Sequence, residues 1–199
     1  QFGEQSPTYT DLLVQGAQIG IPAEAESIYV EANNAIKEFV PMIPVAHGGS
    51  GTAYRSDVTN PQASPLTNEQ FAFSAPGDRD TFVWMQNAEP ISMFCADESD
   101  GESLRACDQV MEALYGYEVN GTATEPVLAE SCEPNEDLTV WTCSLKQGIK
   151  FHDGSDFDAS DVVATFNMGL NIDSPTHVGN SNIWSYYDYL WGLMKKPGS

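Results

Sequence analysis

The clearest periodic pattern in the chain lies close to its N-terminus. Apolar residues recur there at steps of three and four positions, on one helical stripe made of Ile28, Ala32, Ala35, Ile36 and Phe39. Pro22 suits the first turn of a helix, and Pro41 cannot continue one. The pattern therefore predicts a helix between these two prolines, followed by a short buried strand over residues 42–47.

The middle of the chain divides into a polar stretch and an apolar one. Residues 48–80 are rich in Pro, Ser, Asn and Gln with scattered apolar positions, which predicts a long surface connection. Residues 81–86 (TFVWMQ) are almost continuously apolar. Such a run is typical of a strand covered on both faces, so we expect a central strand here.

Two more helices are predicted in the second half. Leu104, Cys107, Val110, Met111 and Leu114 share one helical stripe, and Gly116 is placed to end that helix. Further on, Asp158 can serve as an N-cap and Asp161 as its capping-box partner. The buried face of this last helix is expected to consist of Val162, Val163, Phe166 and Leu170.

A hairpin is predicted between these helices. Residues 130–133 and 138–145 have strand character, and they flank the turn-forming sequence at 134–137 (PNED). Helices that alternate with strands indicate the α/β class. We therefore expect a mixed sheet with flanking helices.

Charge excludes one broad class of partner. The 199 residues contain 8 Lys and Arg against 29 Asp and Glu, a formal net charge of −21. Nucleic-acid binding depends on cationic neutralisation of phosphates, so no nucleic-acid partner is expected. The longest nearly uninterrupted apolar run, residues 39–46, is too short to span a membrane, and any secretory signal is expected to lie outside these 199 residues.

Four cysteines stand at positions 95, 107, 132 and 143, and they allow three pairings. Local pairing of Cys95 with Cys107 and of Cys132 with Cys143 would close two loops of about 12 residues. That arrangement favours an oxidising, extracytoplasmic compartment, whereas four free thiols in a cytosolic protein are the alternative. The cysteine spacing is not that of a zinc site.

Catalytic and metal chemistry have little support in the sequence. His47, His152 and His177 are isolated from one another and read best as structural or surface histidines. The acidic stretch around Gly101 places no ligand at the first or last position of an EF-hand loop, and the aspartates at 153–161 fit turns and helix caps. We expect no metal, no cofactor and no enzymatic reaction.

The aromatic residues near the C-terminus have two interpretations. Trp184, Tyr186, Tyr187, Tyr189 and Trp191 follow one another closely. Such rings either pack in a core or interface or form a platform on which a sugar or peptide stacks. We favour the first interpretation.

Residues 126–166 resemble the signature region of extracytoplasmic solute-binding proteins of the oligopeptide, dipeptide and nickel class of ABC importers, family 5. The resemblance rests on the LAES motif at 128–131, on GIKFHDG at 148–154 and on the helix start at 161–163. It implies a partial lobe of a type II periplasmic-binding-protein fold. The motif residues His152 and Asp153 are expected to fix a turn.

The order of the segments differs from the usual family order. Residues 24–47 resemble the family's final helix and strand, yet they precede the segment that resembles its opening. We therefore divide the chain into a C-terminal-like part with a long connection (1–77), an N-terminal-lobe-like part (78–194) and a frayed tail (195–199). The first two parts are expected to form one folded unit, and the order implies either a duplication or a permutation.

The resemblance implies a function without catalysis. The chain would be part of a receptor outside the cytoplasmic membrane that captures peptides or similar small solutes and delivers them to an ABC permease. Because ligands bind beyond the carboxyl ends of strands, Asn87 and Glu89, which follow residues 81–86, are the candidate ligand contacts. The alternative is a duplicated lobe fragment that acts as a structural, interaction or homodimerisation domain.

Overall fold

The computed structural model describes residues 7–20, 22–46, 48, 51–63, 66, 69–192 and 194. The chain forms two compact units. The first contains Gln1–Ser50 and Glu133–Thr142, and the second contains Gly51–Cys132 and Cys143–Ser199. In the part of the chain that is described, no helix has the length and apolarity needed to cross a membrane.

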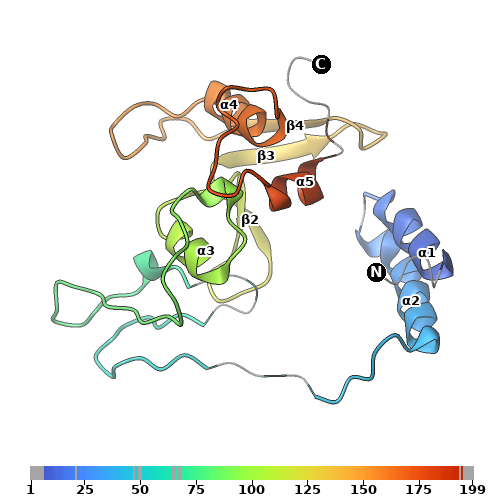
Figure 1. Ribbon diagram of the computed structural model, residues 1–199, viewed down its shortest axis with the longest axis horizontal. Coiled ribbons are helices and arrows are strands. Elements are labelled where there is room, and N and C mark those ends of the chain that lie inside the picture. The colour runs from blue at the N-terminus through green and yellow to red at the C-terminus, as the bar shows by residue number, and fades with distance from the viewer. Residues whose placement is uncertain are drawn as a thin grey trace. The chain divides into compact units, whose positions relative to one another are not determined.

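The first unit is built on a pair of helices. Helix α1 (Pro7–Ala17) packs against α2 (Pro22–Phe39), and the two lie side by side in Figure 1. Close approach depends on Gly16, where an added Cβ would lie 2.6 Å from the ring of Tyr29. Helix α2 confirms the helix predicted between Pro22 and Pro41, and α1 is an element that the sequence analysis missed.

The strand predicted after α2 is wrong. Residues 42–46 have no regular secondary structure, and Ile43 and Val45 are 80% and 91% exposed. An apolar run becomes a buried strand only when neighbouring strands cover it, and no described segment pairs with this one. His47 lies outside the described residues.

Much of the second unit is irregular, as the polar composition of residues 48–80 predicts. Within that stretch the regular features are the short η1 helix (Phe71–Phe73) and an antiparallel bridge between Thr59 and Ala75. Next come η2 (Cys95–Asp97) and α3 (Gly101–Cys107), which contact each other. The surface connection is thus confirmed in its described residues.

Helix α3 is shorter than predicted. It ends at Cys107, and Gly116 lies in strand β1 (Tyr115–Tyr117), which pairs antiparallel with β2 (Thr124–Pro126). The carbonyl of Leu114 accepts hydrogen bonds from the N–H groups of Val127 and Ala129, at 3.0 and 3.1 Å. Strand pairing therefore takes the backbone groups that a longer helix would need.

The central strand predicted over residues 81–86 is also wrong. The segment is extended, but it belongs to no sheet. Its side chains alternate: Phe82 and Trp84 are partly buried, whereas Val83 and Met85 are 80% and 90% exposed. One face of the segment is covered by aromatic side chains, and the other face is open.

The predicted hairpin is confirmed. Strand β3 (Ala129–Pro134) pairs with β4 (Trp141–Leu145), and Cys132 is disulfide-bonded to Cys143. The side-chain oxygen of Asn135 accepts hydrogen bonds from the N–H groups of Thr139 and Val140, at 2.9 and 3.0 Å. Together with the helices, the strands place the chain in the α/β class, with two separate two-stranded sheets in the described residues.

Helix α4 (Ala159–Leu170) begins with the predicted capping box. The side chain of Asp158 accepts from the N–H of Ser160 at 2.7 Å, and that of Asp161 accepts from the N–H of Asp158 at 2.8 Å. Val163 is 57% exposed, so its placement on the buried face is wrong. The helix packs against α5 (Ser185–Trp191), as Figure 1 shows.

The C-terminal aromatic residues are sorted by helical periodicity. Trp184 is 2% exposed, and its ring packs edge-on against those of Phe94 and Tyr187. Tyr186 and Tyr189 point elsewhere and are 46% and 83% exposed. Packing in the core thus accounts for part of the aromatic cluster.

Candidate functional site

The most extensive pocket described in the second unit lies along the extended segment 81–86. It has a volume of about 370 Å³ and is lined by residues 51–55 and 82–85, together with Val58 and Arg79. Arg55 and Arg79 belong to this lining, and no carboxylate does. In a chain with a net charge of −21, a pocket lined by cations and no acid is unusual.

Aromatic rings form the floor of this pocket. The ring of Trp84 lies 5.7 Å from that of Tyr54 and 4.8 Å from that of Phe71, and the rings of Phe71 and Phe82 are 5.0 Å apart. These separations are those of favourable tilted aromatic pairs. The cluster holds residues 82 and 84 in place although their backbone has no neighbouring strand.

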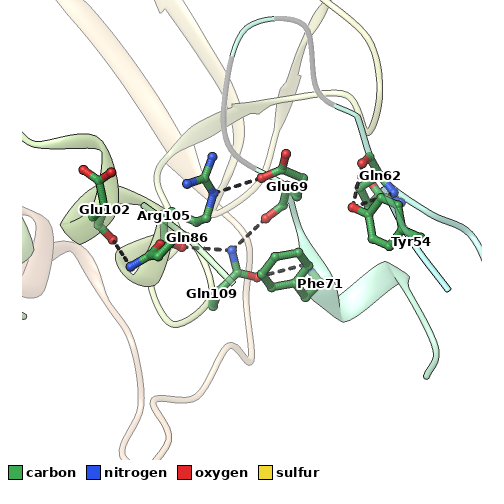
Figure 2. A network of polar contacts seen from close by, with 8 residues as sticks. All are labelled: Tyr54, Gln62, Glu69, Phe71, Gln86, Glu102, Arg105 and Gln109. Atoms are coloured by element: carbon green, nitrogen blue, oxygen red, sulfur yellow. Dashed lines mark hydrogen bonds and ion pairs between the residues drawn. The ribbon is translucent and has the colours of Figure 1, made fainter. Parts of the chain in front are cut away.

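A polar network supports the cluster from the side of α3 (Figure 2). The guanidinium of Arg105 donates to the carboxylate of Glu69 at 3.0 Å and lies 5.8 Å from the centre of the Trp84 ring. Gln109 donates to the carbonyl of Glu69 at 2.7 Å and accepts from the N–H of Phe71 at 2.9 Å. Because Glu69 is 8% exposed, its charge is stabilised mainly by this pairing.

Tyr54 fixes the opposite wall of the pocket. Its hydroxyl donates to the carbonyl of Gln62 at 2.6 Å and accepts from the N–H of the same residue at 3.2 Å (Figure 2). Burial raises the pKa of the Tyr54 phenol above its ordinary value. The group is therefore neutral at physiological pH and serves as a hydrogen-bonding strut between two irregular segments.

Two guanidinium groups share one carboxylate beside the pocket. Nε of Arg55 and an Nη of Arg79 lie 3.2 and 3.4 Å from the same oxygen of Asp57. The hydrogen bond from Arg55 lowers the pKa of Asp57, so this carboxylate stays ionised. One negative charge thus faces two positive charges, and the trio is net cationic.

The predicted ligand contacts lie directly after the pocket segment. Asn87 and Glu89 are exposed and occupy a bend, and neither lines the pocket. The bend is held by the fully buried hydroxyl of Ser103 on α3, which accepts from the N–H of Ile91 at 2.8 Å. A role for Asn87 and Glu89 in binding stays a prediction.

A buried carboxylate connects the segment before α3 with the start of α5. Asp97 is 6% exposed and accepts hydrogen bonds from the N–H groups of Ser181, Asn182 and Trp184 at 2.6, 2.7 and 2.8 Å, and from the Ser181 hydroxyl. Burial raises the pKa of Asp97, but these hydrogen bonds outweigh it and the pKa is lowered overall. Asp97 is therefore a structural anion.

Both disulfides have the local pairing considered in the sequence analysis. Cys95 is bonded to Cys107, which joins η2 to α3, and Cys132 is bonded to Cys143 across the β3–β4 hairpin. Neither bond contributes to the pocket lining. Among the described residues, no group of His, Cys, Asp and Glu side chains could hold a metal ion.

The two described histidines occupy structural positions. The ring of His177 stacks on Trp184 at 5.0 Å, and its Nδ1 lies 2.7 Å from the carbonyl oxygen of Met168. His152 is exposed in a turn that Asp153 stabilises by accepting from the N–H and hydroxyl of Ser155, at 2.9 and 2.7 Å. Gly154 in this turn has φ +88°, a conformation that favours glycine.

Sequence reasoning missed Arg55 and Arg79. Both lie in a stretch that was assigned to a surface connection or to its end. One signal was present: the chain has 8 Lys and Arg, and these two are the cations between positions 38 and 104. Their convergence on Asp57 depends on tertiary structure and has no signature in the spacing.

Comparison with known proteins identifies the segment that contains the hairpin and α4. Residues 123–183 match the family described as bacterial extracellular solute-binding proteins, family 5 Middle. This segment belongs to the family 5 solute-binding proteins. The resemblance seen in the LAES and GIKFHDG motifs is thereby confirmed, and both motifs lie within the matched residues.

Several curated relatives are similar to a part of the chain. The heme-binding protein A of Haemophilus influenzae is 32% identical over 114 residues, which cover 54% of this chain and 21% of the relative. The di/tripeptide-binding protein 1 of Pseudomonas aeruginosa is 36% identical, with 45% and 18% covered. The nickel-binding periplasmic protein of Escherichia coli is 29% identical, with 49% and 18% covered.

The extent of these matches limits what they show. The chain spans about a fifth of the length of the curated relatives it matches. No solved structure matches the chain. The relatives are named as binding proteins for chemically different ligands, heme, short peptides and nickel, and none of these names describes an enzyme.

Proposed function

We propose that this chain is part of an ABC-transporter substrate-binding protein that captures peptides or similar small solutes outside the cytoplasmic membrane. The observation that carries the proposal is the family 5 segment at residues 123–183. Two disulfides support an oxidising, extracytoplasmic location. In the full-length protein, an ABC permease would receive the solute, and no reaction would be catalysed.

We further propose that the solute contacts Asn87 and Glu89. Both side chains are exposed, and they follow an extended segment that the aromatic cluster holds rigidly on one face. The buried Ser103 hydroxyl fixes the bend that carries them. Residues 1–77 would correspond to the family's C-terminal segment, and residues 78–194 to its N-terminal-lobe segment.

Thermal unfolding in the presence of ligands tests the proposal. The chain would be heated with a pool of di- to pentapeptides, and its melting temperature recorded at increasing peptide concentration. A ligand at 100 times its Kd stabilises the folded state by about 2.7 kcal/mol, which corresponds to roughly 5–10 °C for a chain of this size. No dose-dependent rise with any peptide would contradict solute capture by these residues.

Variants separate the predicted contacts from the remaining surface. Asn87→Ala combined with Glu89→Gln should reduce the peptide-induced rise in melting temperature and leave the melting temperature of the free protein unchanged, because both side chains are exposed. Glu136→Gln, a change at an exposed turn elsewhere in the chain, is the matched control. An equal rise in both variants would contradict the assignment of Asn87 and Glu89.

A further inference from the structure

The pocket beside residues 82–85 has three properties that together specify a ligand. Its walls are two extended segments, residues 51–55 and 81–86, which belong to no sheet. Its floor is aromatic, and its lining carries the guanidinium groups of Arg55 and Arg79. Extended backbone suits strand addition, aromatic rings suit apolar side chains, and guanidinium groups suit carboxylates.

The backbone along the pocket is available for pairing. Within the described residues, no N–H group of residues 81–86 donates a hydrogen bond to another backbone carbonyl. An extended segment with unpaired N–H and C=O groups is a template for an added strand. The alternation of Phe82 and Trp84 inward with Val83 and Met85 outward gives the segment the geometry that an added strand needs.

An unsatisfied donor adjoins the pocket floor. Nε1 of Trp84 is buried and has no hydrogen-bond partner in the described part of the chain. Buried indole N–H groups usually have an acceptor, because leaving one unpaired costs about 1–3 kcal/mol. The carbonyl of a bound peptide is an acceptor of the required kind.

Charge selects the class of peptide. The Arg55 side chain is 71% exposed and that of Arg79 is 35% exposed, so both reach solvent at the pocket. They share the single carboxylate oxygen of Asp57, and each guanidinium has further N–H donors. A second carboxylate, brought by a ligand, would balance the trio.

We propose that this pocket binds an acidic peptide in extended conformation, with its backbone alongside residues 82–85 and one of its carboxylates at Arg55 and Arg79. The inference rests on the proposed function and deepens it, because it names the class of solute. It also assigns to Arg55, Arg79 and Trp84 a role in recognition.

The test compares peptides that differ in charge alone. Calorimetric titration would use the blocked hexapeptide Thr-Glu-Val-Glu-Val-Thr and its counterpart with glutamine in place of both glutamates. We expect the acidic peptide to bind at least tenfold more tightly at low salt, with the difference shrinking as salt screens the arginines. An N-methylated acidic peptide, which lacks backbone donors, should lose at least tenfold in affinity.

Protein variants locate the effect. Arg55→Gln with Arg79→Gln should abolish the preference for the acidic peptide, and the single change Arg55→Gln, at a well-exposed side chain, should reduce it severalfold without affecting folding. Lys150→Gln is the matched control, because it removes one exposed cation of the same unit outside the pocket lining. It should leave the preference unchanged.

The outcomes separate this inference from the proposed function. Equal binding of the acidic and glutamine peptides, or a preference that survives the loss of both arginines, would overturn the acidic-peptide assignment while peptide capture stands. Absence of binding by both hexapeptides and by the whole di- to pentapeptide pool would overturn the proposed function as well. Binding that N-methylation does not weaken would overturn strand addition.

Discussion

The carboxylate of Asp97 accepts a hydrogen bond from the backbone N–H of Trp184 at 2.8 Å, although the two residues are 87 positions apart in sequence. The same carboxylate accepts from Ser181 and Asn182. Asp97 is 6% exposed and Trp184 is 2% exposed. A single buried anion therefore holds the loop before α5 against η2, and the position of α5 against α4 depends on it.

Replacing this anion should destabilise the second unit. Asp97→Asn keeps the size of the side chain, but it removes the charge and directs an amide donor toward backbone donors. Breaking a buried charged network of this kind costs about 3 kcal/mol or more. Urea unfolding followed by tryptophan fluorescence would measure the loss, with the exposed Asp173→Asn as the charge-matched control. A loss no larger than that of the control would contradict the structural role of Asp97.

The stability contributed by Asp97 should depend on pH. Its pKa in the folded state lies below the ordinary value of 3.8 because hydrogen bonds to the ionised form outweigh burial. The contribution is therefore complete well above pH 3.8 and is lost as the pH falls below 3.8 through the folded-state pKa.

A pair of titrations checks this dependence. The difference in free energy of unfolding between the wild type and Asp97→Asn should be constant near neutral pH and should shrink in acid, toward about pH 2. Other aspartates with lowered pKa values, such as Asp100 and Asp153, are present in both proteins and cancel in the difference. A difference that stays constant into acid would contradict the assignment.

Local chemistry explains which parts of the fold could be predicted from the sequence. The capping box of Asp158 and Asp161 and the turn at Asn135 involve residues within five positions of one another, so their spacing identifies them. The helix between Pro22 and Pro41 is likewise bounded by residues that act locally. Such features need no knowledge of the remaining fold.

Features that depend on distant partners could not be predicted. Residues 81–86 have the apolarity of a central strand, yet Trp84 packs against Tyr54 and Phe71, and no strand lies beside it in the described part of the chain. The convergence of Arg55 and Arg79 on Asp57 spans 22 positions between Asp57 and Arg79. For the candidate site, sequence reasoning therefore selected the segment, while its pocket and its cations needed the structure.

The two disulfides should contribute unequally to stability. Each closes a short loop, with separations of 12 and 11 residues, and loop entropy alone assigns about 3 kcal/mol to each. Cys107 is 4% exposed, whereas Cys143 is exposed. Replacing Cys95 and Cys107 with alanine should therefore cost more, because it also leaves a buried cavity.

Urea unfolding of the two double-alanine variants would measure this difference, and mass spectrometry during mild reduction would add a second test. The bond between Cys132 and Cys143 should be reduced first, since a reductant can reach exposed Cys143. Larger destabilisation on loss of the Cys132–Cys143 bond, or earlier reduction of Cys95–Cys107, would contradict the expected order.

Two glycines should respond in opposite ways to alanine. At Gly169 in α4, an added Cβ would lie 2.2 Å from Cδ1 of Tyr187, whereas at Gly101 in the first turn of α3 it would meet no atom within 4 Å. Gly169→Ala must displace Tyr187 from its edge-on contacts with Phe166 and Trp184.

Overpacking costs about 1–3 kcal/mol, which exceeds the gain of about 1 kcal/mol in helix propensity, so Gly169→Ala should be destabilising overall. Gly101→Ala should raise the free energy of unfolding by about 0.5–1 kcal/mol, since it gains propensity without a clash. Comparing the two variants by urea unfolding cancels the common effect of replacing glycine in a helix. If Gly169→Ala proved as stable as Gly101→Ala, the close packing of α4 on α5 would be contradicted, because only a displaced Tyr187 makes the two positions differ.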